Sequence, residues 1–336
     1  MSARYDFASD NVVGAMPEVM AALAEANAGA VSSYGTDSLS ARAADLIRQM
    51  LDADAEVRFV ASGTAANALT LAALAAPHEA VLCHEHSHVA TDETGAPGFF
   101  GSGVGLTPLP GASGRIEGEA LARALAEPDV SHHQSPAALS LTNATEYGVV
   151  YSTAGIADLA GAAKAAGLRI HLDGARLSNA IAAGFDAAKL APLGVDIAVL
   201  GGTKAGSTPT EAIVLFDTAL ARRFDARLKH AGQLVSKGRF LAAPWIGMLE
   251  TGAWTARAAH ANAMARRLSE LMPFPVAHPV DANAVFVAMD DEALARLHAS
   301  GWFVYRFIDG SVRFMCNWST TPDAVDELGA ALKAIQ

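Results

Sequence analysis

The sequence predicts an α/β fold with two parts: a large domain built on a mostly parallel sheet, and a small α+β domain at the C-terminal end. Short apolar runs ending in small residues alternate with helix-like segments over most of the chain, as buried parallel strands with helical crossovers do. From about Ala243 the pattern changes to amphipathic helices and separate short strands. A chain of 336 residues, 51% of them hydrophobic, can bury a sizeable core.

We expect an N-terminal segment over residues 1–16, a large domain over 17–243 and a small domain over 244–336. Apolar residues at helical spacing predict helices over 17–26 and 39–51, and Pro17 suits a first helical turn. The loop between them, NAGAVSSYGTDSLS, is rich in glycine and serine. Its tyrosine, Tyr34, belongs either to a flexible surface loop or to the wall of an active site.

Residues 57–61 predict a strand that runs through Ser62, Gly63 and Thr64 directly into an alanine-rich helix. A helix N-terminus presents unpaired N–H groups and a partial positive charge, which together bind anions. Gly63 lets a ligand approach the backbone, and Thr64 adds a hydroxyl. The alternative is a simple helix cap that needs no ligand.

A dense polar cluster, HEHSHVATDE, follows the next apolar strand and includes His84, His86 and His88. Histidines that alternate on a strand share one face, so a zinc site has to be considered. No later Cys/His pair completes such a site, and we expect no metal. A single histidine that stacks on a planar cofactor is the favoured interpretation.

Three further strand ends carry polar groups. The expected strand over 137–141 ends in TNATEYG, so Asn143 and Glu146 should open into a crevice at the sheet edge. After a helix over 153–166, the runs HLDGARL and VLGGTKAG each end in small residues and one charged group, Asp173 or Lys204. Open α/β sheets bind ligands at such strand ends. The following run over 211–216 is expected to pair antiparallel.

A lysine at a desolvated strand end has a tuned pKa and can act as a Schiff-base nucleophile. An aspartate beside it suits a cofactor whose ring nitrogen stays protonated, as in pyridoxal phosphate. An ordinary salt bridge between Asp173 and Lys204 explains the spacing equally well.

In the C-terminal part, a long helix over 254–271 precedes strands in ANAVFVAM and GSVRFMCNW, with a helix over 291–300 between them. Arg313 interrupts the second, otherwise apolar strand. It is either a charge on an edge strand that faces water or a fork for a substrate carboxylate.

Composition excludes several classes of protein. The net charge of −11 argues against a nucleic-acid or anionic membrane partner. Charged residues interrupt every apolar run before membrane-spanning length, and the segment MSARYDFASDN has no apolar signal core, so we expect a cytoplasmic protein. Cys83 and Cys316 form no metal or disulfide pattern and are expected to be reduced.

In this order, the motifs resemble the threonine aldolase branch of the pyridoxal-phosphate enzymes of fold type I, the aspartate aminotransferase fold. The bacterial low-specificity L-threonine aldolases are the most similar group. The resemblance extends from FASDN to Arg313. It rests on the segments SDN, SSYGTD, SGTAAN, HEHSHVATDETGAP, LTNATEYGVVYS, HLDGARLSNA, LGGTKAG and QLVSKGRFLAAPW.

The resemblance implies roles for individual residues. Lys204 corresponds to the lysine that carries the cofactor, Asp173 to the acid at the pyridine nitrogen, and Arg176 to the arginine on the ring-hydroxyl side. Within one chain, the resemblance assigns Gly63 and Thr64 to the phosphate, His88 to stacking on the ring, and Arg313 with Ser9 to the substrate carboxylate. Two further roles reach the neighbouring subunit: Tyr34 lies in a loop that extends to that subunit's site, and Lys229, Lys237 or Arg239 contacts the phosphate bound there. Another subgroup has a Thr–His pair where this chain has Thr145-Glu146, so a second catalytic histidine does not carry over.

The implied activity is reversible retro-aldol cleavage of L-threonine, L-allo-threonine and related β-hydroxy-α-amino acids to glycine and an aldehyde. His88 is the first choice for the base, with Glu146 or an ordered water as alternatives. A β-eliminating lyase and a cofactor-free scaffold of the same fold are the rival functions. The family implies a dimer or a dimer of dimers. Asp173 and Lys204 should then lie on opposite sides of a ring-sized gap without bonding to each other.

Overall fold

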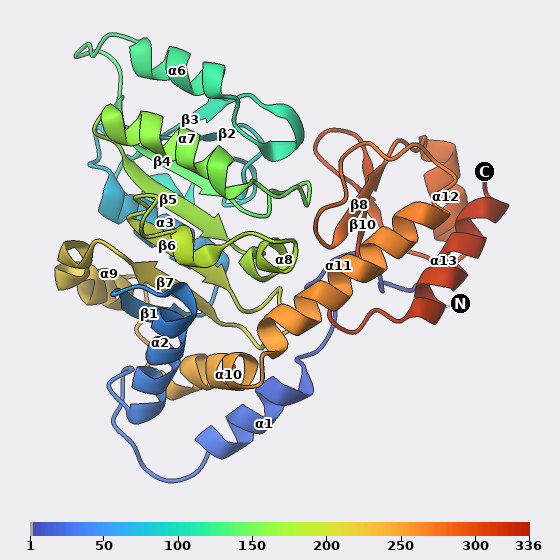
Figure 1. Ribbon diagram of the computed structural model, residues 1–336, viewed down its shortest axis with the longest axis horizontal. Coiled ribbons are helices and arrows are strands. Elements are labelled where there is room, and N and C mark those ends of the chain that lie inside the picture. Colours follow the sequence, from blue (N-terminus) through green and yellow to red (C-terminus); the bar gives the residue numbers. More distant parts are fainter. Residues whose placement is uncertain (1–2) are drawn as a thin grey trace.

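The computed structural model describes residues 3–336, and its largest element is a seven-stranded sheet (Figure 1). The strands lie in the order β1-β7-β6-β5-β4-β2-β3. Four neighbouring pairs are parallel, whereas β7 runs antiparallel to both strands beside it, as expected for the run over 211–216. The strands are β1 (Glu56–Val60), β2 (Glu79–His84), β3 (Gly105–Leu109), β4 (Ser135–Thr142), β5 (Arg169–Gly174), β6 (Ile197–Gly201) and β7 (Glu211–Leu215).

Helices cover both faces of this sheet, which explains the continuous apolar runs of its central strands. In β6 every residue is buried: Ile197 and Val199 face the side covered by α3 (Gly63–Leu74) and α9 (Phe224–His230). Ala198 and Leu200 face the opposite side, covered by helices that include α2 (Ser38–Leu51), α7 (Thr153–Ala165) and α8 (Leu177–Ala182). The sheet therefore carries two apolar layers, and polar groups gather at the strand ends.

The remaining helices of this part connect strands or extend the two layers. They are α1 (Pro17–Ala26), α4 (His88–Thr91), α5 (Ala96–Phe100), α6 (Gly118–Ala126) and α10 (Arg239–Glu250), with short 3-10 turns at Ala112–Gly114, Ala187–Lys189 and Thr218–Arg223.

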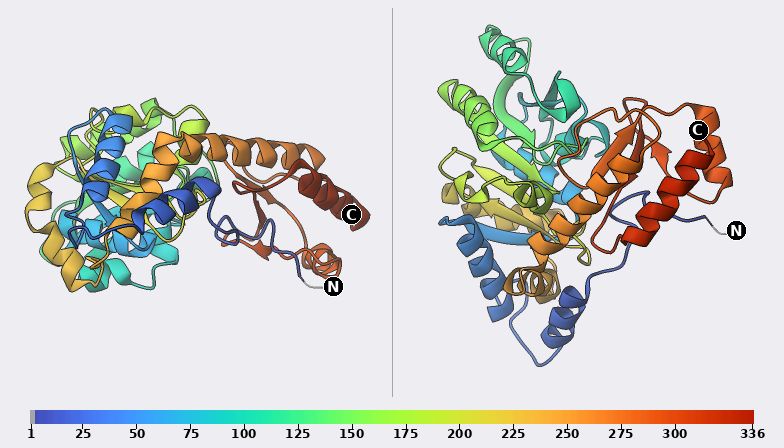
Figure 2. Two further views of the ribbon diagram at one scale, coloured as in Figure 1. Left: turned by 90° about the horizontal axis from the view of Figure 1, so that it is seen from below. Right: turned by 45° about the vertical axis from the view of Figure 1, so that its right-hand side comes forward.

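A second, three-stranded antiparallel sheet in the order β8-β10-β9 forms the C-terminal part. Its strands are β8 (Ala284–Val287), β9 (Tyr305–Arg306) and β10 (Val312–Met315), and its helices are α11 (Ala253–Leu271), α12 (Asp291–Ala299) and α13 (Pro322–Ala334). Figures 1 and 2 show α11 running from the large sheet to this smaller one, with the N-terminal segment beside α13. Phe7 of that segment is buried in the core of the C-terminal part.

Residue 243, the expected end of the large domain, lies within α10. The division of the chain into domains at 16 and 243 stays a prediction. Among the helices of residues 3–336, none combines the length and the hydropathy that a membrane crossing requires.

Two local expectations differ from the structure. His88 does not lie on a strand with His84, because β2 ends at His84 and His88 begins α4. The pattern after Asp173 predicts a helix that includes Arg176, whereas in the structure Arg176 precedes α8. In both cases the chain turns directly after a strand, and a turn aims its side chains in directions that a strand or helix period does not describe.

Candidate active site

A cavity of about 320 Å³ lies at the ends of the parallel strands, between β4, β5, β6 and the N-terminus of α3. This is the crevice where open α/β sheets bind their ligands. Seven of the residues predicted for the site line it: Gly63, Thr64, His88, Glu146, Asp173, Arg176 and Lys204. The fold thus collects into one space residues that lie far apart in the sequence, from Gly63 to Lys204.

Two glycines position Lys204: Gly201, the last residue of β6, and Gly202, which follows it. A Cβ on Gly201 would lie 2.0 Å from the carbonyl oxygen of Ala175, and one on Gly202 would lie 2.5 Å from that of Thr210. Only glycine permits such a close approach, so the turn brings Lys204 to the cavity wall. Burial lowers the pKa of the Lys204 amine from its ordinary value, and the positive charge of Arg176 lowers it further.

Asp173, the fifth residue of β5, is held in its ionised form. Burial opposes ionisation, but the N–H of Ala175 donates to Oδ1 at 2.9 Å and the Asn67 amide donates to Oδ2 at 2.8 Å. With the charge of Lys204 nearby, these bonds keep the pKa of Asp173 below its usual range. Asp173 and Lys204 form no ion pair with each other in the described part of the chain.

Arg176 is oriented by Asp10, which belongs to the SDN segment near the N-terminus. The guanidinium donates from Nε to Oδ2 of Asp10 at 2.6 Å and from Nη2 to Oδ1 at 3.0 Å. Both side chains are nearly buried, and Asn283 of the C-terminal part also donates to Asp10. The two-point contact fixes the plane of the guanidinium beside the cavity.

His88 is held on two sides by carboxylates. Its ring Nδ1 lies 2.9 Å from Oε1 of Glu93, and its backbone N–H donates to Oε1 of Glu146 at 2.9 Å. The hydrogen bond to Glu93 raises the pKa of the His88 imidazole, with burial opposing this effect. Asn67 donates to the same oxygen of Glu93 at 2.8 Å. The histidine is therefore part of a chain of bonds that reaches Asp173.

Two buried carboxyls on the cavity wall have strongly displaced pKa values. Burial raises the pKa of Glu146 to about 7, and the negative charge of Asp173 adds to the shift. Burial likewise raises the pKa of Glu211 to about 7, although Thr203 and Gly202 donate hydrogen bonds to it. A carboxyl that titrates near neutral pH can exchange protons with a substrate.

The N-terminus of α3 has the features of a phosphate site. Ser62 caps the helix by accepting from the N–H of Ala65 at 3.3 Å, and the first N–H groups of a helix have no intrahelical acceptor. A Cβ on Gly63 would meet no atom of residues 3–336 within 4 Å, so open space lies directly against the backbone. An anionic group fits there.

The residues present fit pyridoxal phosphate. A lysine with a lowered pKa, an ionised aspartate and a helix N-terminus surround one cavity. Two residues that line this cavity carry a buried oxygen without a hydrogen-bond partner among the described residues, Oδ1 of Asn67 and Oε2 of Glu146, and so does Glu93, which bonds to His88. Buried polar atoms are normally satisfied, so unpaired ones are a further sign of a binding site.

Arg313 and Ser9, the residues predicted for the substrate carboxylate, lie outside the residues that line this cavity. The Arg313 guanidinium packs on the rings of Tyr305 and Phe307, at 4.9 and 5.3 Å from their centroids. It also donates to the carbonyl oxygen of Ala8, next to Ser9, at 3.5 Å. Its Nε is buried without a partner in the described chain. The pairing of Arg313 with Ser9 at a substrate carboxylate stays a prediction.

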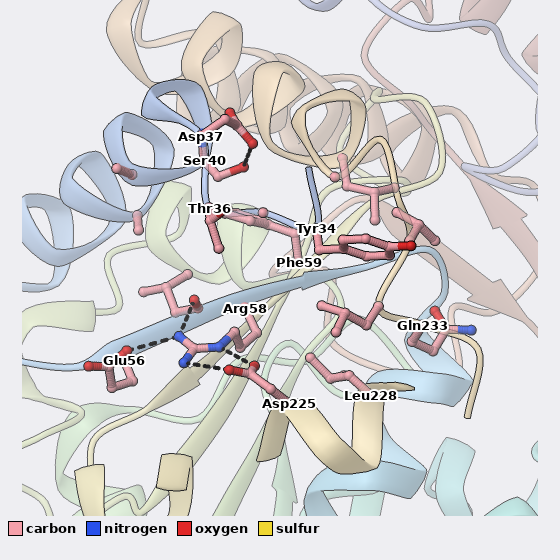
Figure 3. Close-up of a pocket in the computed structure, with 18 of the residues that line it drawn as sticks. Tyr34, Thr36, Asp37, Ser40, Glu56, Arg58, Phe59, Asp225, Leu228 and Gln233 are labelled. Atoms are coloured by element: carbon pink, nitrogen blue, oxygen red, sulfur yellow. Dashed lines mark hydrogen bonds and ion pairs between the residues drawn. The ribbon is translucent and has the colours of Figure 1, made fainter. Parts of the chain in front are cut away.

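Tyr34 lies in a different cavity, of about 480 Å³, between the loop before α2, strand β1 and α9 (Figure 3). Figure 3 shows its ring at one end of this cavity, and Arg58 at the other end bound to Glu56 and Asp225. The ammonium of Lys229 lies 4.6 Å from the centre of the Tyr34 ring.

The segment that carries Lys237 and Arg239 lies beside the same loop. Arg239 donates to the carbonyl oxygen of Gly29, and the backbone of Ser236 accepts from the N–H of Tyr34. Tyr34, Lys229, Lys237 and Arg239 therefore do not line the cavity that contains Lys204 of the same chain. The same holds for Asn143, whose amide binds the backbone of Tyr151.

The three histidines considered for zinc point to different partners. His84 bonds the carbonyl oxygen of Gly111, His86 bonds the hydroxyl of Tyr147, and His88 bonds Glu93. Within residues 3–336, no group of three or more His, Cys, Asp or Glu side chains is placed to hold a metal ion.

Comparisons with known proteins agree with this geometry. A family model described as beta-eliminating lyase matches residues 6–292. A Pseudomonas aeruginosa protein named low specificity L-threonine aldolase is 44% identical over 98% of this chain and 97% of its own length. The chain belongs to the threonine aldolase branch of the β-eliminating lyase family. A second relative of the same name, from a Pseudomonas species, is 43% identical over 98% of this chain and 97% of its own length.

Solved structures place this family member on the expected fold. A threonine aldolase of Leishmania major has a TM-score of 0.93 with 28% identity, and the match covers 99% of both chains. A serine palmitoyltransferase of Sphingomonas wittichii has a TM-score of 0.71 with 15% identity, over 99% of this chain and 86% of that one, and shows the fold alone. The expected family, fold type and lyase class are confirmed.

Sequence reasoning missed four buried polar residues at the site: Asp10, Asn67, Glu93 and Glu211. Asn67 carried a readable signal, because asparagine is a poor helix former and stands inside the alanine-rich helix α3. Asp10 and Glu93 lie inside motifs quoted for the family, SDN and DETGAP, without an assigned role.

Proposed function

We propose that this enzyme uses pyridoxal phosphate to cleave L-threonine, L-allo-threonine and related β-hydroxy-α-amino acids reversibly to glycine and an aldehyde. The observation that carries the proposal is the cavity in which Lys204 and Asp173 stand apart beside the N-terminus of α3. Relatives of 44% and 43% identity named low specificity L-threonine aldolase support the choice of reaction.

The cofactor would be held by residues from five places in the chain. The N–H groups at Gly63 and Thr64 would take the phosphate, and Lys204 would bond the aldehyde carbon through its amine. Asp173, ionised and fixed by Asn67, would face the protonated ring nitrogen, and Arg176 and His88 would contact the ring. When bound, the cofactor accepts the electron pair of the breaking Cα–Cβ bond.

The chain's own residues then bind the substrate and move one proton. Arg313, with Ser9 nearby, would bind the carboxylate and so orient the bond that breaks. A base removes the proton of the β-hydroxyl. His88 is our first choice, and Glu146, whose pKa of about 7 suits proton exchange, or an ordered water are the alternatives.

We also propose that two copies of the chain complete each other's sites. Tyr34 is 44% exposed and lies away from the Lys204 cavity of its own chain. With Lys229, Lys237 and Arg239 it forms one surface region that carries three cations. In a dimer, this region would supply Tyr34 to the partner's substrate and one of the cations, Lys237 first, to the partner's phosphate.

One experiment tests the cofactor and the reaction. The purified chain is expected to be yellow from a lysine-bound cofactor, and Lys204→Ala is expected to abolish both the colour and the cleavage of threonine. A chain that stays colourless with added pyridoxal phosphate would refute the cofactor assignment and support the scaffold alternative.

The family model also describes β-elimination, which is the rival reaction. Product analysis with threonine and phenylserine separates the two. Glycine and an aldehyde support the aldolase, whereas a keto acid and ammonia would refute it. A panel that adds allo-threonine and serine would define the preferred side chain.

A further inference from the structure

Asn67, which lines the cavity, joins two buried carboxylates: Asp173 on the cavity wall and Glu93 behind it. It lies on α3 with 2% of its surface exposed, and its Nδ2 donates to Oδ2 of Asp173 at 2.8 Å and to Oε1 of Glu93 at 2.8 Å. A primary amide has two N–H hydrogens, so each carboxylate receives one. The donor capacity of this amide is fully used.

Glu93 also bonds to His88. The Glu93 side chain is fully buried, and its Oε1, which accepts from Asn67, also lies 2.9 Å from Nδ1 of His88. Asp173 is held at its other oxygen by the N–H of Ala175. A continuous chain of hydrogen bonds therefore runs from Asp173 through Asn67 and Glu93 to His88.

The direction of these bonds fixes where hydrogens lie. An amide nitrogen donates and cannot accept, so Oε1 of Glu93 faces Asn67 as an acceptor. The same oxygen faces His88, and that bond therefore needs its hydrogen on Nδ1. A proton taken up by Glu93 would sit on Oε2, which has no partner in the described chain, and would leave both bonds to Oε1 in place. Burial raises the pKa of Glu93 and makes such uptake easier.

We propose that Asn67 is a positioning residue for the aldol cleavage: it holds Glu93 as an acceptor, so that His88 keeps a hydrogen on Nδ1 and exchanges protons at Nε2. Among residues 3–336, Nε2 of His88 has no hydrogen-bond partner, and His88 lines the cavity. In the cleavage, the substrate O–H bond breaks and an Nε2–H bond forms. The charged groups around the resulting imidazolium are Glu93, Glu146, Asp173 and Lys204.

This inference rests on the proposed function, because it assigns the nitrogen that takes the hydroxyl proton. Without Asn67, two buried carboxylates would lose the donor between them, and their repulsion would favour a proton shared within the pair. Glu93 could then rotate or donate to His88, and the hydrogen would no longer be kept on Nδ1. The expected signature is a change in His88 itself, which a purely structural role would not produce.

The first measurement follows the ring nitrogens by histidine-selective ¹⁵N NMR on the full chain saturated with pyridoxal phosphate, with His88 assigned through His88→Gln. In the wild type, neutral His88 is expected to carry hydrogen on Nδ1. Asn67→Leu is expected to shift His88 toward the Nε2–H form. Asn262→Leu is the matched control, because Asn262 is also a buried asparagine with two side-chain hydrogen bonds, to Asn179, outside the cavity.

The second measurement is steady-state threonine cleavage. Asn67→Leu is expected to lower kcat about 10- to 100-fold and to change KM little, because the loss falls on proton transfer and not on substrate binding. If Asn67→Leu does not fold, Asn67→Ser replaces it. The serine hydroxyl has one hydrogen and can donate to only one of the two carboxylates, so kcat should fall in this variant too.

Unchanged His88 signals and unchanged kcat in the Asn67 variants would overturn the proposal, as would an Nε2–H tautomer in the wild type. The NMR measurement needs no turnover. A wild-type chain that fails to cleave threonine would therefore refute the proposed function, while its His88 signals would still decide whether Asn67 controls the ring hydrogen.

Discussion

Single residues at this site owe their chemistry to opposite displacements of the pKa. Burial lowers the pKa of the Lys204 amine and raises that of Glu146 to about 7, whereas hydrogen bonds and cations keep Asp173 ionised. Burial thus acts on the three groups in different directions: it lowers the pKa of the amine and raises that of the glutamate, whereas the aspartate keeps a pKa below its usual range. The two carboxyls differ in their donors: Asp173 accepts hydrogen bonds at both oxygens, whereas Oε2 of Glu146 has no partner among residues 3–336.

Glu146 makes the stability of the protein depend on pH. Its pKa rises from 4.5 in the unfolded chain to about 7 in the folded one, so its contribution favours folding below pH 4.5 and is lost as the pH rises through 7. Glutamine does not titrate. Between pH 5 and pH 8 the wild type is therefore expected to lose about 2 kcal/mol of unfolding free energy that Glu146→Gln does not lose. The difference in unfolding free energy, variant minus wild type, should rise by that amount.

Urea denaturation of the protein without cofactor at the two pH values measures this difference. Glu119→Gln is the control, because the Glu119 side chain is 92% exposed, and its effect should stay within about 0.5 kcal/mol at both pH values. Parallel stability curves for the wild type and Glu146→Gln would contradict the prediction.

At the scale of elements, each chemical group of the site stands where a strand ends or a helix begins. Asp173 is near the end of β5, Lys204 follows β6, and Gly63 opens α3. These junctions are the points where backbone N–H groups and side chains are free of the regular ladders. The motif patterns in the sequence identified them because small residues and polar groups at the end of an apolar run are local features.

Gly63→Ala tests the α3 N-terminus as the phosphate site. The added methyl group meets no atom of the described chain within 4 Å, so the free energy of unfolding should change by less than about 1 kcal/mol. It would occupy the space beside the first N–H groups of α3, and we expect the Kd for pyridoxal phosphate to rise about 10-fold, measured by absorbance titration.

Gly161→Ala provides the comparison. Gly161 lies inside α7, where a Cβ also meets no atom of residues 3–336 within 4 Å, and alanine should stabilise the helix by about 0.5–1 kcal/mol. Its cofactor affinity should equal that of the wild type. Equal affinity in Gly63→Ala would rule out this helix terminus as the phosphate site.

The whole molecule brings the ends of the chain to the site. Asp10 from the N-terminal segment binds Arg176 across 166 residues, and Asn283 from the C-terminal part donates to the same carboxylate. Arg313 lies on the small sheet and is close enough to Asp10 and Arg176 for their charges to affect its pKa. The site is therefore assembled from both parts of the chain, and a second copy is proposed to complete it.

Mixed dimers test that second copy. Tyr34→Ala and Lys204→Ala are expected to be nearly inactive when purified alone. If Tyr34 serves the partner's cavity, a dimer isolated with one chain of each kind has one intact site, and its kcat per dimer should be about half that of the wild type. A mixed dimer as inactive as its parents would show that Tyr34 acts within its own chain or not at all.

The main strands and helices that carry the site, the antiparallel run at 211–216 and the positions of Lys204, Asp173 and Gly63 beside strand ends could be predicted from the sequence, whereas β3, α9 and α10 could not. The predicted features all follow from patterns a few residues long: apolar periods, glycine turns and the charges that end them. The family resemblance extended these patterns to His88 and Arg176, which the structure places at the same cavity.

Only the tertiary structure decided which side chains pair. Nothing in the local pattern joins Asn67 to Asp173, 106 residues away, or Asp10 to Arg176. The local pattern also gives no sign that Tyr34 lies in a second cavity, away from Lys204. Such contacts depend on the order of strands in the sheet and on the path of the chain ends over it, and hydrophobic periodicity records neither. The short-range pattern thus determines which positions carry reactive side chains. The long-range topology determines which partners each side chain has, and therefore its hydrogen bonds and its pKa.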